Sequence, residues 1–293
     1  MMSRPVFILI AVGLAVAVSL AAGVLVARLD LHSEADVPRL VEKPLRTDWE
    51  SAQLPDFKQH PAGTQRKAAF FGFLFPRVAL ANLEALRQRE GVRALSRMES
   101  LSERQKAWLE THANRLRVSM DSDQLFDKLL RRLDLIPPSL MLAQAANESA
   151  WGTSRFAVKG NNLFGQWCFT RGCGIVPSRR GSGMSHEVAA FDHPYASIRG
   201  YITNLNRHQA YTQLRRLRSQ QRARGSFPEG LTLAGGLEKY SERGQAYVNE
   251  IRSMITHNNL LDYDARLQAI MGSEEPLKKL NQDVRQYREQ HRN

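Results

Sequence analysis

The sequence predicts a mainly α (α+β) fold: a helical domain with a small β-hairpin, preceded by an N-terminal transmembrane helix. Apolar residues recur at helical spacing over most of the chain beyond Lys67, which predicts packed amphipathic helices. Between Cys173 and Asp192, two short apolar runs are joined by a polar segment with glycines, which predicts two strands and a flexible tip. Residues 5–27 carry no charge, as expected for a membrane-spanning helix.

The uncharged stretch is 23 residues long. A helix rising about 1.5 Å per residue would let it cross a hydrocarbon core of roughly 30 Å. Arg4 precedes it, and Arg28 and Asp30 follow, which favours a cytoplasmic N-terminus and an exported body. A cleaved signal peptide is the alternative, because Ser19-Leu20-Ala21 resembles a cleavage site, although the run exceeds the roughly 7–15 apolar residues usual for a signal. Both interpretations place the body outside the cytoplasm.

The composition fits one folded domain with helical additions. The chain has 293 residues, 43% hydrophobic and 24% charged, which is enough for a packed core and too mixed for a disordered chain. Its formal charge of +12 favours an anionic partner, and export excludes nucleic acid. The arginine-rich residues 215–224 predict a solvated helix face or, alternatively, attraction to anionic wall polymers or lipid headgroups.

The segment after the predicted membrane helix, residues 31–66, contains four prolines among polar residues and is predicted to be a linker. A helical N-terminal extension is expected over residues 67–125. Within it, residues 67–98 are predicted as two helices with a break at Pro76, because proline interrupts helical hydrogen bonding.

Further helices are predicted over residues 105–118, 121–135, 195–208 and 244–258. Asp121 or Ser122 is the expected N-cap of the second of these. The last residues, 264–293, are polar and are predicted to form a surface helix or a loose tail.

A single carboxylate, Glu148, lies among small, aromatic and amide residues. Residues 136–139 (IPPS) predict the start of a short helix, since proline suits the first helical turn. Gly152 is the expected terminator, which puts Glu148 in the last turn. The helix C-terminus and desolvation by Trp151 should raise the pKa of the Glu148 carboxyl. A protonated Glu148 can donate a proton to a leaving group.

The motif Glu148-Ser-x-Trp-Gly-x-Ser, followed by residues 161–165 (NNLFG), resembles the core of bacterial cell-wall glucosaminidases of glycoside hydrolase family 73, which have a lysozyme-like fold. The flanking LIPPSLMLAQAA, Gln166-Trp-Cys and Gly174-Ile-Val-Pro are closer still to bacterial Bax-type proteins, which are unrelated to the apoptosis regulator. The resemblance covers about residues 127–262 and implies a catalytic domain over 126–263. It also implies that Glu148 is the general acid that protonates a glycosidic oxygen.

Glycoside hydrolysis generally needs a second group. The resemblance implies Glu187, at the start of the second predicted strand, and Tyr240, near the acid. Asp192 is a weaker candidate, because it is expected to cap the following helix. Tyr247 lies on an apolar helix face and is expected to pack in the core.

Six residues are candidates for glycan contact. Amide side chains suit sugar hydroxyl and N-acetyl groups, and aromatic rings suit sugar faces. The candidates are Trp151, Asn161, Asn162, Phe164, Gln166 and Trp167.

Cys168 and Cys173 are the only cysteines. They bracket a short glycine-containing loop and are expected to form a disulfide in an oxidising compartment. Free thiols and a zinc site are the alternatives. The zinc alternative is weak, because a structural site needs four ligands and His186, His193 and His208 show no ligand-like spacing with the cysteines.

These observations together predict a membrane-held periplasmic endo-β-N-acetylglucosaminidase, or one secreted to the periplasm, that needs no cofactor. Its expected partners are peptidoglycan glycan strands and the membrane, not nucleic acid. A lytic transglycosylase on the same fold and a non-catalytic peptidoglycan-binding module are the alternatives.

Overall fold

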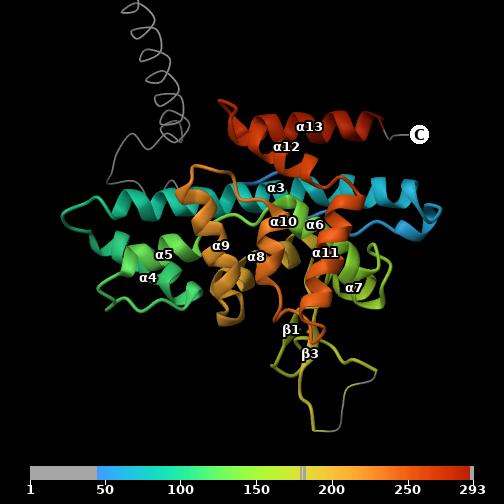
Figure 1. Ribbon diagram of the computed structural model, residues 1–293, viewed down its shortest axis with the longest axis horizontal. Coiled ribbons are helices and arrows are strands. Elements are labelled where there is room, and N and C mark those ends of the chain that lie inside the picture. Colours follow the sequence, from blue (N-terminus) through green and yellow to red (C-terminus); the bar gives the residue numbers. More distant parts are fainter. Residues whose placement is uncertain (1–44, 179, 181–182, 291–293) are drawn as a thin grey trace, which may run out of the picture.

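The computed structural model describes residues 45–178, 180 and 183–290 of the chain (Figure 1). The predicted membrane helix, residues 5–27, lies outside the described residues, as do residues 31–44 of the predicted linker. Everything below concerns the described part of the chain.

The described part is mainly helical with one small sheet, as the sequence predicted. Its α-helices are α3 (Thr64–Leu95), α4 (Glu103–Leu116), α5 (Leu125–Arg132), α6 (Pro138–Ser149), α7 (Arg155–Gly160), α8 (Pro194–Arg207), α9 (Thr212–Ala223), α10 (Gly230–Leu233), α11 (Gln245–His257), α12 (Leu261–Met271) and α13 (Pro276–Gln290). Its 3-10 helices are η2 (Phe57–Gln59), η3 (Gln209–Tyr211) and η4 (Ala234–Gly236), and its strands are β1 (Trp167–Cys168), β2 (Gly174–Ile175) and β3 (Glu187–Ala189).

Helix α3 runs across the whole width of the molecule, with α12 and α13 on one side and the other helices and the sheet on the opposite side (Figure 1). It is continuous through Pro76, so the predicted break is wrong. Leu74, Phe75 and Val78 are buried around the proline, and this packing offsets the helix-breaking cost of roughly 3 kcal/mol. The neighbouring Arg77 also donates from its guanidinium to the Phe73 carbonyl at 2.6 Å.

Helix α3 is also long and apolar enough to cross a membrane. However, 78% of its most apolar window is buried inside the protein. Within the described ranges, α3 therefore behaves as the central helix of a folded core.

Helix α6 is enclosed by α3, α10, α11 and α12. Every residue from 138 to 146 is buried, so the helix has no solvent-facing side before its last turn. Pro137 at its N-cap position provides no capping side chain. Asp264 of α12 does so instead: its carboxylate accepts hydrogen bonds from the Ser139 N–H at 2.7 Å and the Ser139 hydroxyl at 2.6 Å.

The segments on either side of the predicted domain are part of the core. Residues 264–290, expected as a surface helix or a loose tail, form most of α12 and α13, and α13 packs on α3 through the buried Leu280 and Val284. Trp49 and Phe57, expected within a linker, are buried in the same core. Sequence periodicity misses such isolated anchors because each is a single apolar residue among polar neighbours.

A second hydrophobic cluster joins the end of α3 to α4 and α5. Helix α5 begins only at Leu125, after Gln124, whose side chain makes no capping hydrogen bond. The expected cap at Asp121 or Ser122 is therefore wrong.

The arginines of α9 do not all face solvent. Arg218 is 1% exposed and donates to the Leu135 carbonyl at 2.9 Å and to Asn206 Oδ1 at 2.8 Å. Burial raises the pKa of the nearby Asp134 carboxyl, but Arg218, Arg222 and Arg89 outweigh this and hold its pKa below the usual value. The solvated face predicted for residues 215–224 is thus wrong for its buried members.

The sheet is antiparallel in the order β1-β3-β2. Strands β2 and β3 form the predicted hairpin, with Ile175 opposite Val188. Strand β1, with Trp167 opposite Val188, was not predicted, because two residues are too few to show an alternating pattern.

The N-terminal cap of α6 provides a stability prediction. We expect Asp264→Ala to lower the free energy of unfolding by about 2 kcal/mol, because it leaves buried donors at Ser139 without an acceptor. Urea denaturation measures this change. Asp262→Ala, an exposed position on the same helix, is the matched control; equal effects of the two substitutions would contradict the capping role.

Candidate active site

Glu148 lies in the last turn of α6, where the sequence places it. The helix ends at Ser149 because Ala150 adopts a left-handed conformation, with φ of 49°. Trp151 and Gly152 follow with φ of 59° and 76°, so the chain turns away sharply. Left-handed backbone at non-glycine residues is costly and concentrates at functional sites.

The Glu148 carboxyl is half-buried, and its two oxygens have different surroundings. Oε1 accepts a hydrogen bond from the Tyr247 hydroxyl at 2.7 Å. Oε2 lies 3.5 Å from the position that a Cβ on Gly165 would occupy, and Gly165 is exposed. Burial raises the pKa of Glu148, while hydrogen bonds from Tyr247 and Asn147 lower it; the net pKa lies above the ordinary value.

A chain of buried hydrogen bonds leads to Glu148 from the core. The Tyr201 hydroxyl donates to Gln144 Oε1, and Gln144 Nε2 donates to the Tyr247 oxygen at 2.8 Å. Because the amide nitrogen donates to Tyr247, the Tyr247 proton points to Glu148 Oε1. When Glu148 is protonated, its proton therefore belongs on Oε2, the oxygen beside Gly165.

Of the two tyrosines, Tyr247 makes the direct hydrogen bond to Glu148. Its ring is also buried in the core, as the sequence predicted. Tyr240, expected near the acid, stacks on Tyr247 with ring centroids 5.5 Å apart and donates to the Phe164 carbonyl at 2.7 Å. The sequence did not predict the hydrogen bond of the Tyr247 hydroxyl, because the residue lies among apolar neighbours on α11. Gln144 was also missed, although its place four residues before Glu148 puts it on the same helix face.

Four of the side chains predicted to contact a glycan instead make hydrogen bonds or ring contacts within the protein. Asn162 donates to the Gln166 and Ala189 carbonyls at 2.9 and 2.8 Å. Phe164 is 1% exposed and stacks on Tyr201. The other two, Asn161 and Gln166, hydrogen-bond the Phe191 carbonyl and the Ser197 hydroxyl, both at 2.9 Å. These contacts shape the loop that carries Gly165 past Glu148.

The two tryptophans differ in exposure. Trp151 is half-buried and packs edge-on against Phe70 and Phe71, with ring centroids 5.8 and 5.3 Å away. Trp167 is 57% exposed and stacks on His186 at 4.1 Å. Trp167 is therefore the better placed of the two to present a flat face to a sugar.

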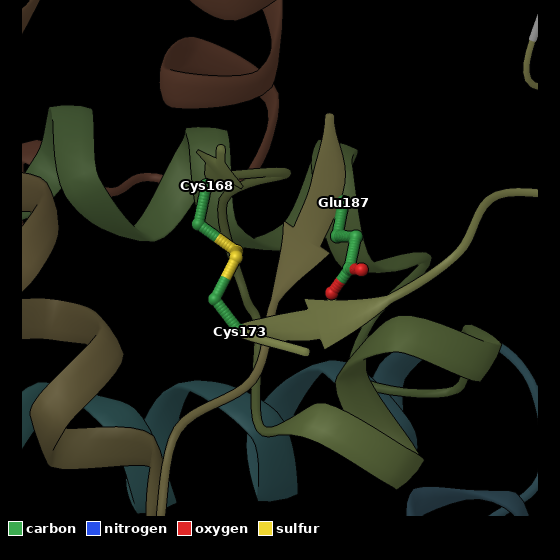
Figure 2. Close-up of side chains that lie close together, drawn as sticks. All are labelled: Cys168, Cys173 and Glu187. Atoms are coloured by element: carbon green, nitrogen blue, oxygen red, sulfur yellow. A yellow bond between two sulfur atoms is a disulfide. The ribbon is translucent and has the colours of Figure 1, made fainter. Parts of the chain in front are cut away.

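Cys168 and Cys173 form a disulfide beside Glu187 (Figure 2). The three side chains are close enough to bind a metal, but the disulfide occupies both sulfurs, so the zinc alternative does not fit. The Glu187 carboxylate accepts hydrogen bonds from the backbone N–H groups of Gly172 at 3.0 Å and Gly174 at 2.8 Å. These bonds lower the pKa of Glu187, so its ionised carboxylate holds the disulfide loop.

Asp192 does not cap α8. His193 occupies the N-cap position and accepts from the Ala196 N–H through Nδ1 at 3.3 Å, so this expectation is wrong. A carboxylate that sequence reasoning missed is Glu250, which lies one turn after Tyr247 on α11. Its negative charge contributes to the raised pKa of Glu148, and it pairs with Arg243 at 2.6 Å.

Comparisons with known proteins place this geometry in context. Residues 123–260 match the glucosaminidase family, described as mannosyl-glycoprotein endo-beta-N-acetylglucosaminidase. The chain is 32% identical over 219 residues to Protein bax of Escherichia coli (strain K12), covering 74% of this chain and 78% of that protein. No solved structure matches the chain.

The hydrogen bond from Tyr247 predicts a titration effect. Removing it in Tyr247→Phe takes away a donor that favours ionised Glu148, so the pKa of Glu148 should rise above its wild-type value. NMR titration of carbon-13-labelled glutamate side chains measures this pKa. The matched control, Tyr240→Phe, loses only the bond to Phe164 and should leave the pKa nearly unchanged; an unchanged pKa in Tyr247→Phe would show that the bond does not act on Glu148.

Proposed function

The chain belongs to the glucosaminidase family as a Bax-type protein, and we propose that it cleaves N-acetylglucosaminyl bonds in peptidoglycan with Glu148 as the general acid. Family membership indicates a glycoside hydrolase that acts on a glycan. The observation that supports the finer proposal is the Glu148 carboxyl itself, half-buried, with a raised pKa and one oxygen facing an exposed glycine.

In the proposed reaction, Glu148 protonates the glycosidic oxygen from Oε2. Tyr247 holds Oε1 by its hydrogen bond, which fixes the direction of the carboxyl. Its raised pKa keeps a larger fraction of Glu148 protonated near neutral pH than an ordinary glutamate would have. Such acid catalysis contributes on the order of 10²–10⁴-fold in rate.

For the second group, we propose the substrate's own N-acetyl carbonyl. The carboxylate predicted for this step, Glu187, is bound by Gly172 and Gly174, and Glu250 is paired with Arg243. Substrate assistance occurs among glycoside hydrolases and needs no second free carboxylate. Tyr240 then supports Tyr247 by stacking, and Trp167 offers a sugar platform.

We propose that residues 126–263 act as the catalytic domain, with residues 67–125 and 264–290 packed around them. The disulfide fits an oxidising compartment such as the periplasm. An uncleaved membrane helix at residues 5–27 would hold this domain at the inner membrane, whereas signal cleavage would release it into the periplasm.

The test is digestion of purified peptidoglycan by the full chain in detergent, with the released ends identified by mass spectrometry. We expect reducing N-acetylglucosamine ends from the wild type, and a rate about 10²–10⁴-fold lower for Glu148→Gln. Glu238→Gln, an exposed carboxylate two residues before Tyr240, is the control and should retain full activity.

The other outcomes of this digestion contradict the proposal in distinct ways. Anhydro-muramyl ends would assign the protein to the lytic transglycosylases. Retained binding to peptidoglycan without release of fragments, unchanged in Glu148→Gln, would make it a wall-binding module.

A further inference from the structure

The exposed large apolar side chains of the described residues gather in one part of the chain. They belong to α7 and to the sheet with its loops. The sheet and its loops project from the helical body on the side away from α13, whereas α7 lies beside α11 (Figure 1). We call the described residues between 155 and 189 the β lobe. Its exposed apolar residues are Val158 (56%), Trp167 (57%), Phe169 (72%), Val176 (49%) and Met184 (51%). These elements adjoin one another, since α7 contacts β2 and β2 pairs with β3, and exposed apolar side chains on adjoining elements can form an interaction surface.

The same part of the sequence is strongly basic. Between Ser149 and His186 there are five lysine or arginine residues and no aspartate or glutamate. Lys159 and Arg171 are exposed on the lobe. Glu187 of β3 is the one carboxylate of the strands, and its charge interacts with Arg180 and Arg171. The basic residues still outnumber it, and this excess of positive charge favours an anionic partner.

The lobe is also held in shape before any partner binds. The Cys168–Cys173 disulfide closes the loop that carries Phe169, and Glu187 ties Gly172 and Gly174 of the same region to β3. Arg155 donates to the Val176 carbonyl at 2.9 Å. A surface fixed in this way loses less conformational entropy on docking.

An anionic glycan accounts for only part of this surface. Sugar faces stack on the flat ring of Trp167, but aliphatic Val158, Val176 and Met184 gain free energy only by entering an apolar phase. Basic side chains surrounding exposed aromatic and aliphatic residues are the composition of proteins that lie at the interface of an anionic bilayer.

The lobe also lies within reach of a bilayer that holds the predicted N-terminal helix. Seventeen residues separate Ala27 from Leu45, and such a segment spans up to about 60 Å when extended. Shortly after this segment, Gln53 donates to the Asp192 carbonyl at 3.0 Å and contacts Asn161, at the base of the lobe. The described part of the chain thus starts beside α13, where Trp49 donates from Nε1 to Asn281 Oδ1 at 2.9 Å, and reaches the base of the lobe by Gln53.

We propose that the β lobe docks on an anionic phospholipid membrane, with Phe169, Val176 and Met184 entering the headgroup region and Lys159 and Arg171 contacting lipid phosphates. This interaction is separate from glycan cleavage and does not depend on Glu148. It would hold the catalytic domain close to the bilayer in addition to the N-terminal helix.

Fluorescence quenching by lipids tests the proposal on the full chain. The chain has four tryptophans, of which Trp49 and Trp108 are buried and Trp151 is half-buried, so Trp167 is the one open to quenching by brominated acyl chains. We expect brominated phosphatidylglycerol vesicles to quench wild-type fluorescence at least twofold more strongly than brominated phosphatidylcholine vesicles. The excess should disappear in Trp167→Phe.

Two variants separate docking from folding. Phe169→Ser combined with Met184→Ser should abolish the excess quenching, and Arg171→Glu should weaken it, while thermal unfolding and peptidoglycan cleavage stay at wild-type values. Equal quenching by the two lipids, or quenching unchanged in the double variant, would overturn the proposal. If soluble peptidoglycan fragments but not vesicles shield Trp167 from acrylamide, the surface belongs to the glycan and the membrane proposal fails.

Discussion

The structure depends on keeping a polar helix end inside an apolar core. Helix α6 is enclosed by four other helices, yet it carries Gln144 and Glu148 on one face. Burying an amide without partners would cost several kcal/mol, so α8 and α11 must supply the hydroxyls of Tyr201 and Tyr247. The same contacts that satisfy Gln144 set the direction of the Tyr247 proton, and through it the orientation of the Glu148 carboxyl. Core packing and the orientation of the Glu148 carboxyl thus depend on the same series of hydrogen bonds.

Both ends of α6 are fixed by residues distant in sequence. Asp264 caps its N-terminus from α12, which gives the C-terminal segment a part in positioning the acid. At the other end, the left-handed residues after Ser149 turn the chain away, and the Asn162 hydrogen bonds bring Gly165 back beside Glu148. Gly165 is suited to this place because its φ of 62° favours glycine and a side chain there would crowd the carboxyl.

Sequence reasoning predicted the helical class, the hairpin and the place of Glu148 in its helix, because each rests on a local pattern: apolar spacing, glycine-bounded apolar runs, or prolines at a helix start. It failed where single residues act at long range. Trp49, Phe57 and Asp264 each contact residues far along the chain, and no local periodicity marks them. Pro76 was predicted to break a helix. The burial of the residues around it, which stabilises the continuous helix, cannot be seen in the sequence. Tyr247 was expected to pack in the core, and its ring does so. Its hydroxyl, oriented by the hydrogen bond from Gln144, in addition donates to Glu148.

Gln144→Met is the most direct test of whether the buried hydrogen bonds orient the Glu148 carboxyl. Methionine keeps the length of the side chain but offers neither the acceptor for Tyr201 nor the donor for Tyr247. We expect kcat for peptidoglycan cleavage to fall at least about tenfold, the size of one lost hydrogen bond to a reacting group, while KM stays near the wild-type value. A kcat equal to that of the wild type, in a protein with unchanged KM, would show that Glu148 needs no orientation from the core.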